Sequence, residues 1–312
     1  MHLYKLNKQN IELSKAEVLA LAKKQQHELV QGYLLLDKLV DFKRLAYTKK
    51  VYEILFETNK DSLFKDLRSY DFNTIYKESF RLRLINNPGF KESELADIMW
   101  QGLNNPKTDL KNAGTKIDII FLSEKRVFCC QLLGEKNEKF EDRKAHLRPY
   151  NHPTSLHPRL ARCMVNLAAS KEILDPFCGS GGILIEAGLI GLNITGYDLY
   201  QEMIERAKKN LEHYNIEDYK LESKNSLNIN QEFESIVTDL PYGKNSKAGN
   251  LEETYKGFLN KAKRFVDKIV VGFPDFTDNK KIIRDSQWNI KNEFTYYIHK
   301  SMNKKIFVLV KD

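Results

Sequence analysis

The chain has 312 residues, of which 42% are hydrophobic and 29% are charged. This composition excludes a disordered chain and supplies enough apolar side chains for a buried core, and the length suits two domains. The formal net charge of +8 favours a polyanionic partner such as RNA or DNA, although a generally lysine-rich proteome would give the same balance.

The cysteines and the lack of long apolar runs indicate which kinds of protein this chain can be. The four cysteines form no CxxC pair, so we expect neither a zinc site nor a disulfide framework. Reduced thiols suit a cytoplasmic protein. The N-terminal sequence MHLYKLNKQN has no apolar signal core, and no apolar run has the length of a membrane span. We therefore expect a soluble, cytoplasmic protein without bound metal, and a monomer by default.

The first part of the chain, residues 1–135, is predicted to be a smaller α+β region. Ser14 and Glu17 match a capping box, which predicts a short helix that begins after Ser14. Polar and apolar residues alternate over 79–84, as in a half-buried strand. The remaining predicted elements are strands at 33–36, 116–122 and 126–133 and helices at 48–57, 62–70 and 92–103.

The pattern changes after a charged, irregular stretch at 136–150, which is predicted to be a linker. Residues 151–312 form the second predicted domain, in which strands alternate with helices. That alternation predicts an α/β fold with a doubly wound parallel sheet and helices on both faces. Its strands are predicted at 172–175, 194–198, 235–239 and 268–273, followed by a terminal antiparallel hairpin at 294–299 and 305–310.

The first motif that carries chemistry is the glycine-rich segment ILDPFCGSGG at 173–182, which leads from a strand into a helix. Gly179 and Gly181 allow a tight turn and a close approach of the backbone to a ligand. Asp175 precedes them at the end of the strand, where it would repel a phosphate. The motif therefore favours a ligand with an amino group and no phosphate, such as the methionyl end of S-adenosylmethionine.

Polar residues follow the next two strands as well. Asp198 ends the second strand about twenty residues downstream, where a carboxylate can accept hydrogen bonds from ribose hydroxyls. The alternative for Asp198 is a helix N-cap. Asn225 and Ser226 follow the third strand, and Asn225 could hydrogen-bond an adenine, although both are also ordinary turn residues.

The second motif is TDLPYG at 238–243, at the end of the fourth strand. An exocyclic amine on a purine is conjugated and is a poor nucleophile, so it needs hydrogen-bond acceptors that direct its lone pair. Asp239 can be one acceptor and can take the proton that is lost, and the carbonyl of Leu240 can be another. Pro241 stiffens the turn, and Tyr242 offers a ring for stacking of an extruded base. The alternative is a simple Asp-x-Pro turn with a packed tyrosine.

Four arginines are candidates for contacts with phosphates. Arg159 and Arg162 lie about one helical turn apart in HPTSLHPRLAR, and Arg81 and Arg83 share one face of a predicted strand. The alternative for both pairs is a solvated surface. The two histidines of HPTSLHPRLAR have no acidic or cysteine partner at ligand spacing, so no metal site is predicted there.

At these motifs the chain resembles the class I methyltransferases that methylate amino groups, whose signature is (D/N)PP(Y/F). More narrowly, HPTSLHPRLAR, LDPFCGSGGILIEAGLIG and TDLPYG are similar in order and wording to the archaeal tRNA guanosine N2-methyltransferases that act at position 10. The specific resemblance covers about residues 140–245. The N-terminal part is similar in length and pattern to the THUMP-containing region of that family.

The resemblance implies a seven-stranded sheet with a reversed last strand, S-adenosylmethionine as methyl donor, tRNA as substrate, and an RNA-grasping N-terminal region with ferredoxin-like and THUMP parts. It places the target base beside Asp239, Leu240, Pro241 and Tyr242. The cofactor contacts that it implies are Asp175, Pro176, Cys178, Gly179, Gly181, Asp198, Leu199, Asn225, Ser226, Thr154 and Ser155.

Three departures from the family pattern stand out. Leu240 replaces the first proline of the signature, Tyr200 stands where an acid is common, and Asn225 stands where aspartate is usual. Other targets with a planar amine stay open, namely another tRNA or rRNA guanosine, adenine N6 and protein glutamine. Asp239 argues mildly against a sister family that carries asparagine there. A non-catalytic RNA-binding protein is the alternative of another class, which the intact acids and glycines disfavour.

Overall fold

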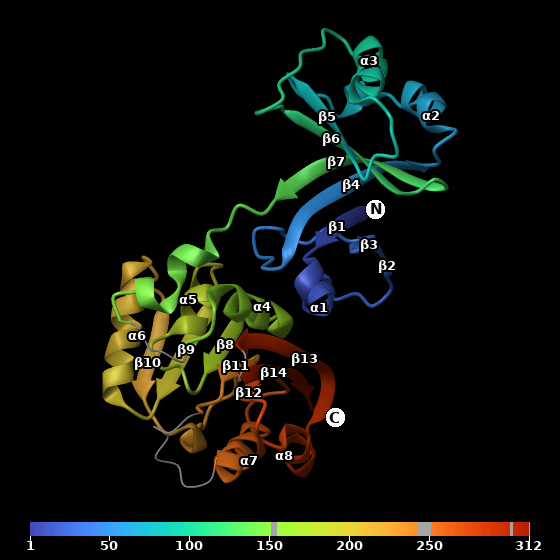
Figure 1. The fold of residues 1–312 in the computed structure, drawn as a ribbon. Coiled ribbons are helices and arrows are strands. Elements are labelled where there is room, and N and C mark those ends of the chain that lie inside the picture. Colours follow the sequence, from blue (N-terminus) through green and yellow to red (C-terminus); the bar gives the residue numbers. More distant parts are fainter. Residues whose placement is uncertain (151–154, 243–250, 300–301, 312) are drawn as a thin grey trace. The chain divides into compact units, whose positions relative to one another are not determined.

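The computed structural model describes residues 1–150, 155–242, 251–299 and 302–311 (Figure 1). The chain divides into two compact units. The first comprises residues 1–11, 24–43 and 48–137, and the second comprises 12–23, 44–47 and 138–312. Within the described residues, each unit is built around a seven-stranded sheet.

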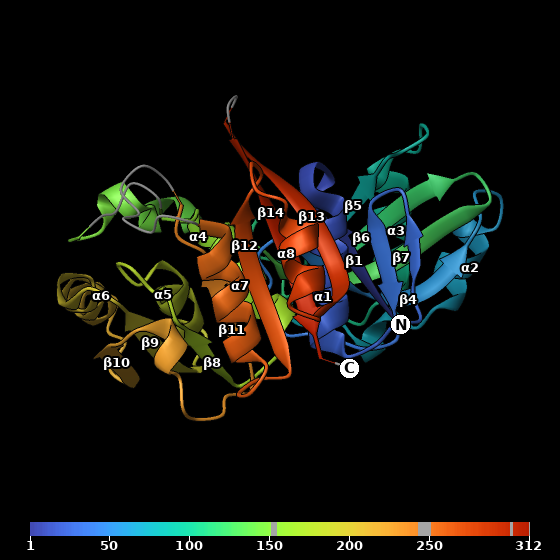
Figure 2. The same ribbon diagram turned by 90° about the horizontal axis from the view of Figure 1, so that it is seen from below.

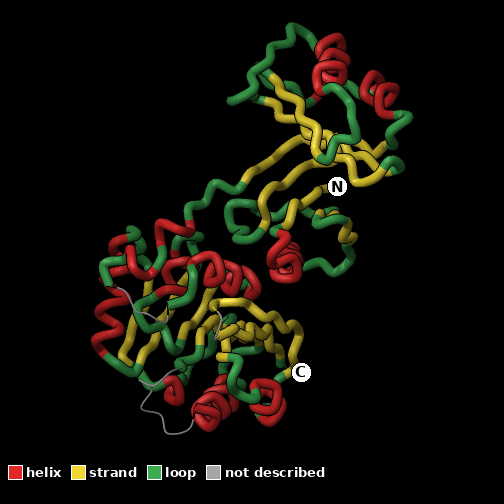
Figure 3. The backbone as a smooth tube through the Cα atoms, in the orientation of Figure 1, coloured by secondary structure: helices red, strands yellow, loops and turns green. Residues whose placement is uncertain are grey.

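The first unit has a mixed sheet with the strand order β2-β3-β1-β4-β7-β6-β5. Its strands are drawn in yellow in Figure 3. Its strands are β1 (His2–Leu6), β2 (Glu28–Val30), β3 (Tyr33–Leu36), β4 (Thr48–Thr58), β5 (Phe80–Ile85), β6 (Thr115–Ser123) and β7 (Arg126–Glu135). Helices α2 (Leu63–Ser69) and α3 (Glu92–Gly102) cover one face and bury Leu67, Leu95 and Met99 against it.

Most of the elements predicted for this unit are confirmed, but the helix predicted at 48–57 is wrong. That segment is β4, which pairs with β1 on one side and with β7 on the other. Val51 and Tyr52 are buried between these neighbours. β-Branched and aromatic residues pack well on a pleated surface. Because β4 is also hydrogen-bonded to a strand on each side, the segment is more stable as a strand than as the helix that the spacing of its apolar residues suggested.

The predicted capping box is also wrong. Helix α1 spans Ile11–Ala22, so Ser14 and Glu17 lie inside it. Both side chains are buried, and the Glu17 carboxylate accepts hydrogen bonds from the backbone N–H groups of Ala46 and Tyr47. Apart from Ile11, this helix belongs to the second unit.

The second unit has the strand order β10-β9-β8-β11-β12-β14-β13. Its strands are β8 (Glu172–Asp175), β9 (Asn193–Asp198), β10 (Tyr219–Ser223), β11 (Ile236–Asp239), β12 (Lys268–Pro274), β13 (Asn289–His299) and β14 (Met302–Val310). Strands β8 to β12 run parallel, and β14 is antiparallel to both β12 and β13. The doubly wound sheet with a terminal antiparallel hairpin is therefore confirmed.

Helices cover both faces of this sheet (Figure 2). On β11, Val237 faces one hydrophobic cluster and Ile236 faces the other, as expected for a strand buried on both sides. Residues of α1, α4 (Pro158–Ala168), α5 (Gly182–Gly188) and α6 (Gln201–His213) belong to the first cluster, and those of α7 (Leu251–Ala262) and α8 (Asn279–Asp285) belong to the second. Among the described residues, no helix is both long and apolar enough to cross a membrane.

Candidate active site

Three neighbouring strands of the second sheet end in aspartates. Asp175 ends β8, Asp198 ends β9 and Asp239 ends β11. The strands run parallel in the order β9-β8-β11, so their carboxyl ends meet at one edge of the sheet. In open α/β sheets this edge is where ligands bind.

The glycine-rich turn after β8 is anchored to the end of β9. Gly179 and Gly181 have φ angles of 50° and 84°, in the left-handed region that favours glycine. The Gly179 N–H donates to Asp198 Oδ2 at 2.9 Å, and the Cys178 N–H donates to the Tyr197 carbonyl at 2.9 Å. The turn is thus held in one conformation by the strand beside it.

Asp175 lies behind this turn with only 2% of its surface exposed. Its Oδ1 accepts hydrogen bonds from Thr238 Oγ1 at 2.7 Å and from the Phe177 N–H at 3.2 Å. Burial raises the pKa of Asp175 to about 7, against the opposing effect of the Thr238 hydrogen bond. Near neutral pH, a bound cationic group would therefore favour the ionised form of Asp175.

The residues predicted near the ribose and adenine lie at the adjacent strand ends. Asp198 Oδ1 accepts from the Tyr200 N–H at 3.1 Å, and the N-cap of α6 is Tyr200 rather than Asp198. Asn225 is exposed, and its Oδ1 accepts from the Leu227 N–H at 2.9 Å. Of the remaining predicted contacts here, Pro176 and Ser226 are buried and Leu199 is exposed.

Asp239 is paired with a lysine that the sequence analysis missed. The Lys304 ammonium donates to both carboxylate oxygens of Asp239, at 2.5 and 2.6 Å. The Lys304 side chain is fully buried, whereas the Asp239 side chain is 14% exposed. The same ammonium lies 4.0 Å from the centroid of the Tyr242 ring. Residues two apart in a strand point to the same face, so the alternation in β14 could have placed Lys304 on the side of the buried Ile306. The pair Lys304-Lys305 hid this signal, because two adjacent lysines suggest an exposed strand end.

Gly272 on β12 makes room for this pair. The register aligns Gly272 with Asp239 on β11 and with Ile306 on β14. A Cβ atom at Gly272 would lie 2.5 Å from Asp239 Oδ1 and 3.3 Å from Lys304 Cδ. Only a residue without a side chain lets the lysine reach across the intervening strand.

The turn after Asp239 is anchored without the proline that the signature has in second place. The Leu240 N–H donates to the Gly272 carbonyl at 3.0 Å, which a proline could not do, and the Leu240 side chain is buried in the core. The Tyr255 hydroxyl donates to the Pro241 carbonyl at 2.5 Å. These contacts hold the turn in place.

Comparisons with known proteins agree with this geometry. Residues 145–304 match the family model described as "RMKL-like, methyltransferase domain". The chain is 32% identical to the tRNA (guanine(10)-N2)-dimethyltransferase of Methanothermobacter thermautotrophicus, over 86% of this chain and 83% of that protein. It is 31% identical to the protein of the same name from Pyrococcus abyssi, over 96% of each. The chain belongs to the archaeal tRNA (guanine(10)-N2)-dimethyltransferase family.

Two solved structures share the fold of this chain along its whole length. TrmN from Thermus thermophilus aligns with a TM-score of 0.52 at 17% identity, over 100% of this chain and 99% of that chain. SMU.472, a putative methyltransferase complexed with SAH, aligns with a TM-score of 0.50 at 13% identity, over 100% and 98% of the two chains. At these identities the likeness concerns the fold.

Two of the four arginines predicted to meet RNA are buried in ion pairs. Arg81 lies inside the first unit, 3.0 Å from Asp118. Arg162 is 1% exposed and lies 2.9 Å from Glu186 in the second unit. Because both guanidinium groups are buried and paired, this structure offers neither of them to a phosphate, and the prediction is corrected for both.

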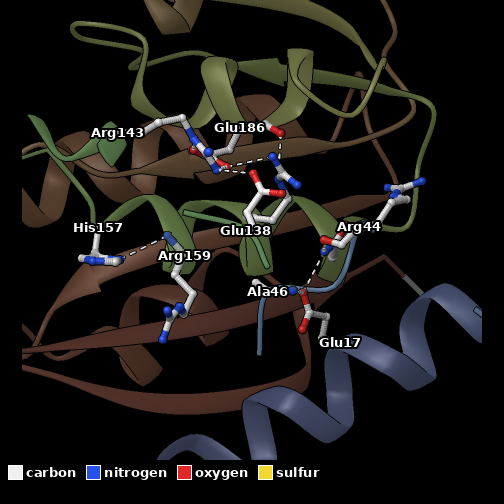
Figure 4. Close-up of polar contacts among 10 residues, drawn as sticks. Glu17, Arg44, Ala46, Glu138, Arg143, His157, Arg159 and Glu186 are labelled. Carbon is white, nitrogen blue, oxygen red and sulfur yellow. Dashed lines mark hydrogen bonds and ion pairs between the residues drawn. The ribbon is translucent and has the colours of Figure 1, made fainter. Parts of the chain in front are cut away.

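The other two arginines and the segment before α4 have different surroundings. Arg83 is exposed on β5. Arg159 is partly buried beside the Phe140 ring, 5.4 Å from its centroid, and its N–H donates to His157 Nδ1 (Figure 4). Ser155 Oγ lies 3.4 Å from Ser180 Oγ at the glycine turn, and Thr154 falls outside the described residues.

Among the parts of the chain that the structure describes, no three His, Cys, Asp or Glu side chains are grouped so as to hold a metal ion. The cysteines are free and buried.

Proposed function

We propose that this protein transfers a methyl group from S-adenosylmethionine to the exocyclic N2 of a guanosine at position 10 of tRNA. The observation that carries the proposal is the position of Asp239, a partly exposed carboxylate at the carboxyl end of β11, two strands from Asp198 and next to Asp175. Relatives that align over most of the chain are named for this reaction.

The groups at the strand ends fit S-adenosylmethionine. Asp175 would hold the methionyl amino group, and Asp198 would accept from the ribose hydroxyls. A Cβ atom on Gly179 would meet no described atom within 4 Å, so the turn leaves room in front of it. Bound S-adenosylmethionine supplies an electrophilic methyl group on a sulfonium. Its remaining proposed contacts are Pro176, Cys178, Gly181, Leu199, Asn225, Ser226, Thr154 and Ser155.

Asp239 supplies what the target amine lacks. Its carboxylate accepts a hydrogen bond from N2 and directs the nitrogen lone pair, with the Leu240 carbonyl as the second acceptor. As the bond from N2 to the methyl carbon forms, the bond from that carbon to sulfur breaks, and Asp239 takes the proton that N2 loses. The Tyr242 ring and Pro241 would line the site that the target base occupies.

We further propose that residues 1–135 comprise ferredoxin-like and THUMP parts and bind the tRNA. Residues 136–150 would link them to the catalytic domain at 151–312. The enzyme would work as a monomer. The net charge of +8 of the whole chain supports a polyanionic substrate, and the seven-stranded mixed sheet of the first unit is a separate folded region that could bind it. Free, buried cysteines suit a reducing compartment, so we place the activity in the cytoplasm.

The test is transfer of labelled methyl groups to unmodified tRNA, followed by nucleoside analysis. We expect N2-methylated guanosine from the wild type. Asp239→Ala should lower the single-turnover rate by roughly 100-fold or more while leaving the affinities for S-adenosylmethionine and tRNA close to wild type. Asp267→Ala, which removes an exposed carboxylate paired with Lys311, is the matched control and should keep the rate. Label in adenosine or in protein would overturn the substrate, and an active Asp239→Ala enzyme would overturn the role of Asp239.

A further inference from the structure

The buried lysine of the last strand has no place in the reaction described so far. We infer that Lys304 is a positioning residue for methyl transfer, which fixes the Asp239 carboxylate and the Tyr242 ring in a single arrangement. This inference rests on the proposed function of Asp239.

The contacts of the ammonium define the plane of the carboxylate. Lys304 Nζ lies 2.5 Å from Oδ1 and 2.6 Å from Oδ2, so it donates to both oxygens at once. The lysine is wholly buried and Asp239 is 14% exposed, so the ammonium occupies the buried side of the carboxylate. Each carboxylate oxygen has a further acceptor site, which is left for the substrate on the exposed side.

The ammonium also holds the aromatic ring. At 4.0 Å from the ring centroid of Tyr242, Lys304 Nζ is within the range of a cation–π contact, which is stronger where water is excluded. One charge from β14 therefore positions both the acceptor proposed for the amine and the ring proposed to stack on the base.

The sheet leaves space for the contact between Lys304 and Asp239. Among the described residues of β14, only Lys304 pairs with Asp239. Gly272 leaves the face of β12 open between the two side chains. The next residue, Lys305, has the opposite parity, is 31% exposed, and donates to Thr295 Oγ1 at 2.8 Å. Lys305 is thus a neighbouring lysine of the same strand that does not touch Asp239.

The pairing has a chemical consequence. Burial raises the pKa of Asp239, and Lys304 opposes that rise through its charge and its hydrogen bonds. A protonated carboxyl group keeps an oxygen that can accept a hydrogen bond, but it cannot take the proton that the amine loses. The proposed role of Asp239 as proton acceptor therefore requires the ionised form. Among the described residues, the other titratable groups that interact electrostatically with Asp239 are Asp175, Tyr242 and Tyr255.

The experiment compares Lys304→Met with Lys305→Met in the full-length enzyme. Single-turnover rates of methyl transfer to tRNA are measured from pH 5.5 to 9, together with the dissociation constant of S-adenosylmethionine. For Lys304→Met we expect a rate about 100-fold lower near pH 7, an acid limb moved to higher pH, and unchanged cofactor affinity. Lys305→Met should keep both the rate and the limb.

A second pair of variants separates positioning from folding. Asp239→Asn combined with Lys304→Met removes both charges, so its melting temperature should recover relative to Lys304→Met alone. In the Asp239→Asn background, Lys304→Met should slow transfer far less than it does in the wild type, because the lysine acts through that carboxylate. Gly272→Ala should reproduce the slow rate of Lys304→Met, whereas Gly257→Ala on α7, whose Cβ would make only an ordinary contact at 3.7 Å, should not.

Two results would overturn the inference. The first is an unchanged rate and pH profile for Lys304→Met. The second is a loss of transfer rate in Lys304→Met that is the same at all pH values and equally large in the Asp239→Asn background. Either result leaves the proposed function intact as long as the wild type methylates guanosine N2. A wild type that methylates another amine would refute the proposed substrate, and the lysine comparison would then be judged with that amine.

Discussion

The three aspartates at the sheet edge differ in their surroundings. Asp175 is buried under a hydroxyl and a backbone N–H, Asp198 is tied to the glycine turn, and Asp239 is paired with a lysine. The same residue type is thus a buried carboxyl group with a raised pKa, an anchor of the glycine turn, and the partner of a buried ammonium group. Environment rather than residue type sets what each can do.

Asp175 makes stability depend on pH in a defined direction. Its pKa is about 7 in the folded protein, against an ordinary value of 3.8. Between those values the unfolded chain releases a proton that the folded protein retains, so this group lowers stability as pH rises from 4 to 7. Asp175→Asn removes the effect and keeps Oδ1 as the acceptor of both hydrogen bonds.

We therefore expect the stability of Asp175→Asn relative to wild type to increase with pH, by on the order of 3 kcal/mol between pH 4 and pH 8. Thermal unfolding at a series of pH values measures this difference. Asp267→Asn, at an exposed position, should show no such trend. A difference between Asp175→Asn and wild type that is constant with pH would mean that the folded pKa is ordinary.

At the residue scale, the sequence predicted the partners that a motif encodes and missed those that the sheet brings together. Asp175, Asp198 and Asp239 follow from strand ends and turns along the chain. Lys304 and Gly272 do not, because their roles come from the pairing of β11, β12 and β14. A lysine beside another lysine, and a glycine within an apolar strand, give no local sign of a shared contact.

Among the elements, α1 shows how far tertiary contacts can redirect a local signal. Its Glu17 accepts a hydrogen bond from the Ala46 N–H at 2.7 Å (Figure 4). It also accepts from the Tyr47 N–H at 3.0 Å and from Asn166 Nδ2 at 2.7 Å. The spacing from Ser14 to Glu17 matches a capping box, but the carboxylate instead satisfies donors of a loop and of α4. Local spacing cannot reveal a partner so distant in the sequence.

Removing this carboxylate should destabilise the second unit. Glu17→Ala leaves two buried backbone N–H groups and the Asn166 amide without this acceptor, and we expect the free energy of unfolding to fall by roughly 3–5 kcal/mol. Chemical denaturation followed by tryptophan fluorescence measures the loss, since Trp288 is buried in this unit. Glu12→Ala, which removes an exposed carboxylate of the same helix paired with Lys15, is the control. Equal stability of the two variants would contradict the anchoring role of Glu17.

The helix predicted at 48–57 failed for a related reason. Apolar residues in that segment satisfy a helical spacing as well as a strand, and only the flanking strands β1 and β7 decide between the two. Where strands alternate with helices and each carries its own turn, as from β8 to β12, prediction and structure agree closely.

For the whole molecule, the fold class could be predicted because the alternation of elements is a local pattern repeated along the second half of the chain. The assignment of residues 12–23 and 44–47 to the second unit could not, because it depends on contacts across more than a hundred residues. Buried ion pairs escape prediction as well, because a partner in another element is not visible locally even when it lies only 37 residues away, as for Arg81 and Asp118, or 24, as for Arg162 and Glu186.

The net charge of +8 predicts how the affinity for tRNA responds to salt. Phosphate contacts release counterions, so we expect the dissociation constant for tRNA to rise about 100-fold or more between 50 and 200 mM NaCl. The dissociation constant for S-adenosylmethionine, measured by calorimetry in the same buffers, should change little. A salt-insensitive affinity for tRNA would mean that recognition does not depend on its phosphates.

The chain passes between its two units several times before residue 48, because α1 and residues 44–47 belong to the second unit while the strands around them belong to the first. During synthesis α1 leaves the ribosome early, yet its partner Asn166 is 149 residues further along than Glu17. The catalytic unit therefore cannot complete its core until both units have been largely translated. A shuffling event that exchanged the catalytic half alone would leave behind a helix of that core, so this architecture favours inheritance of the two units together.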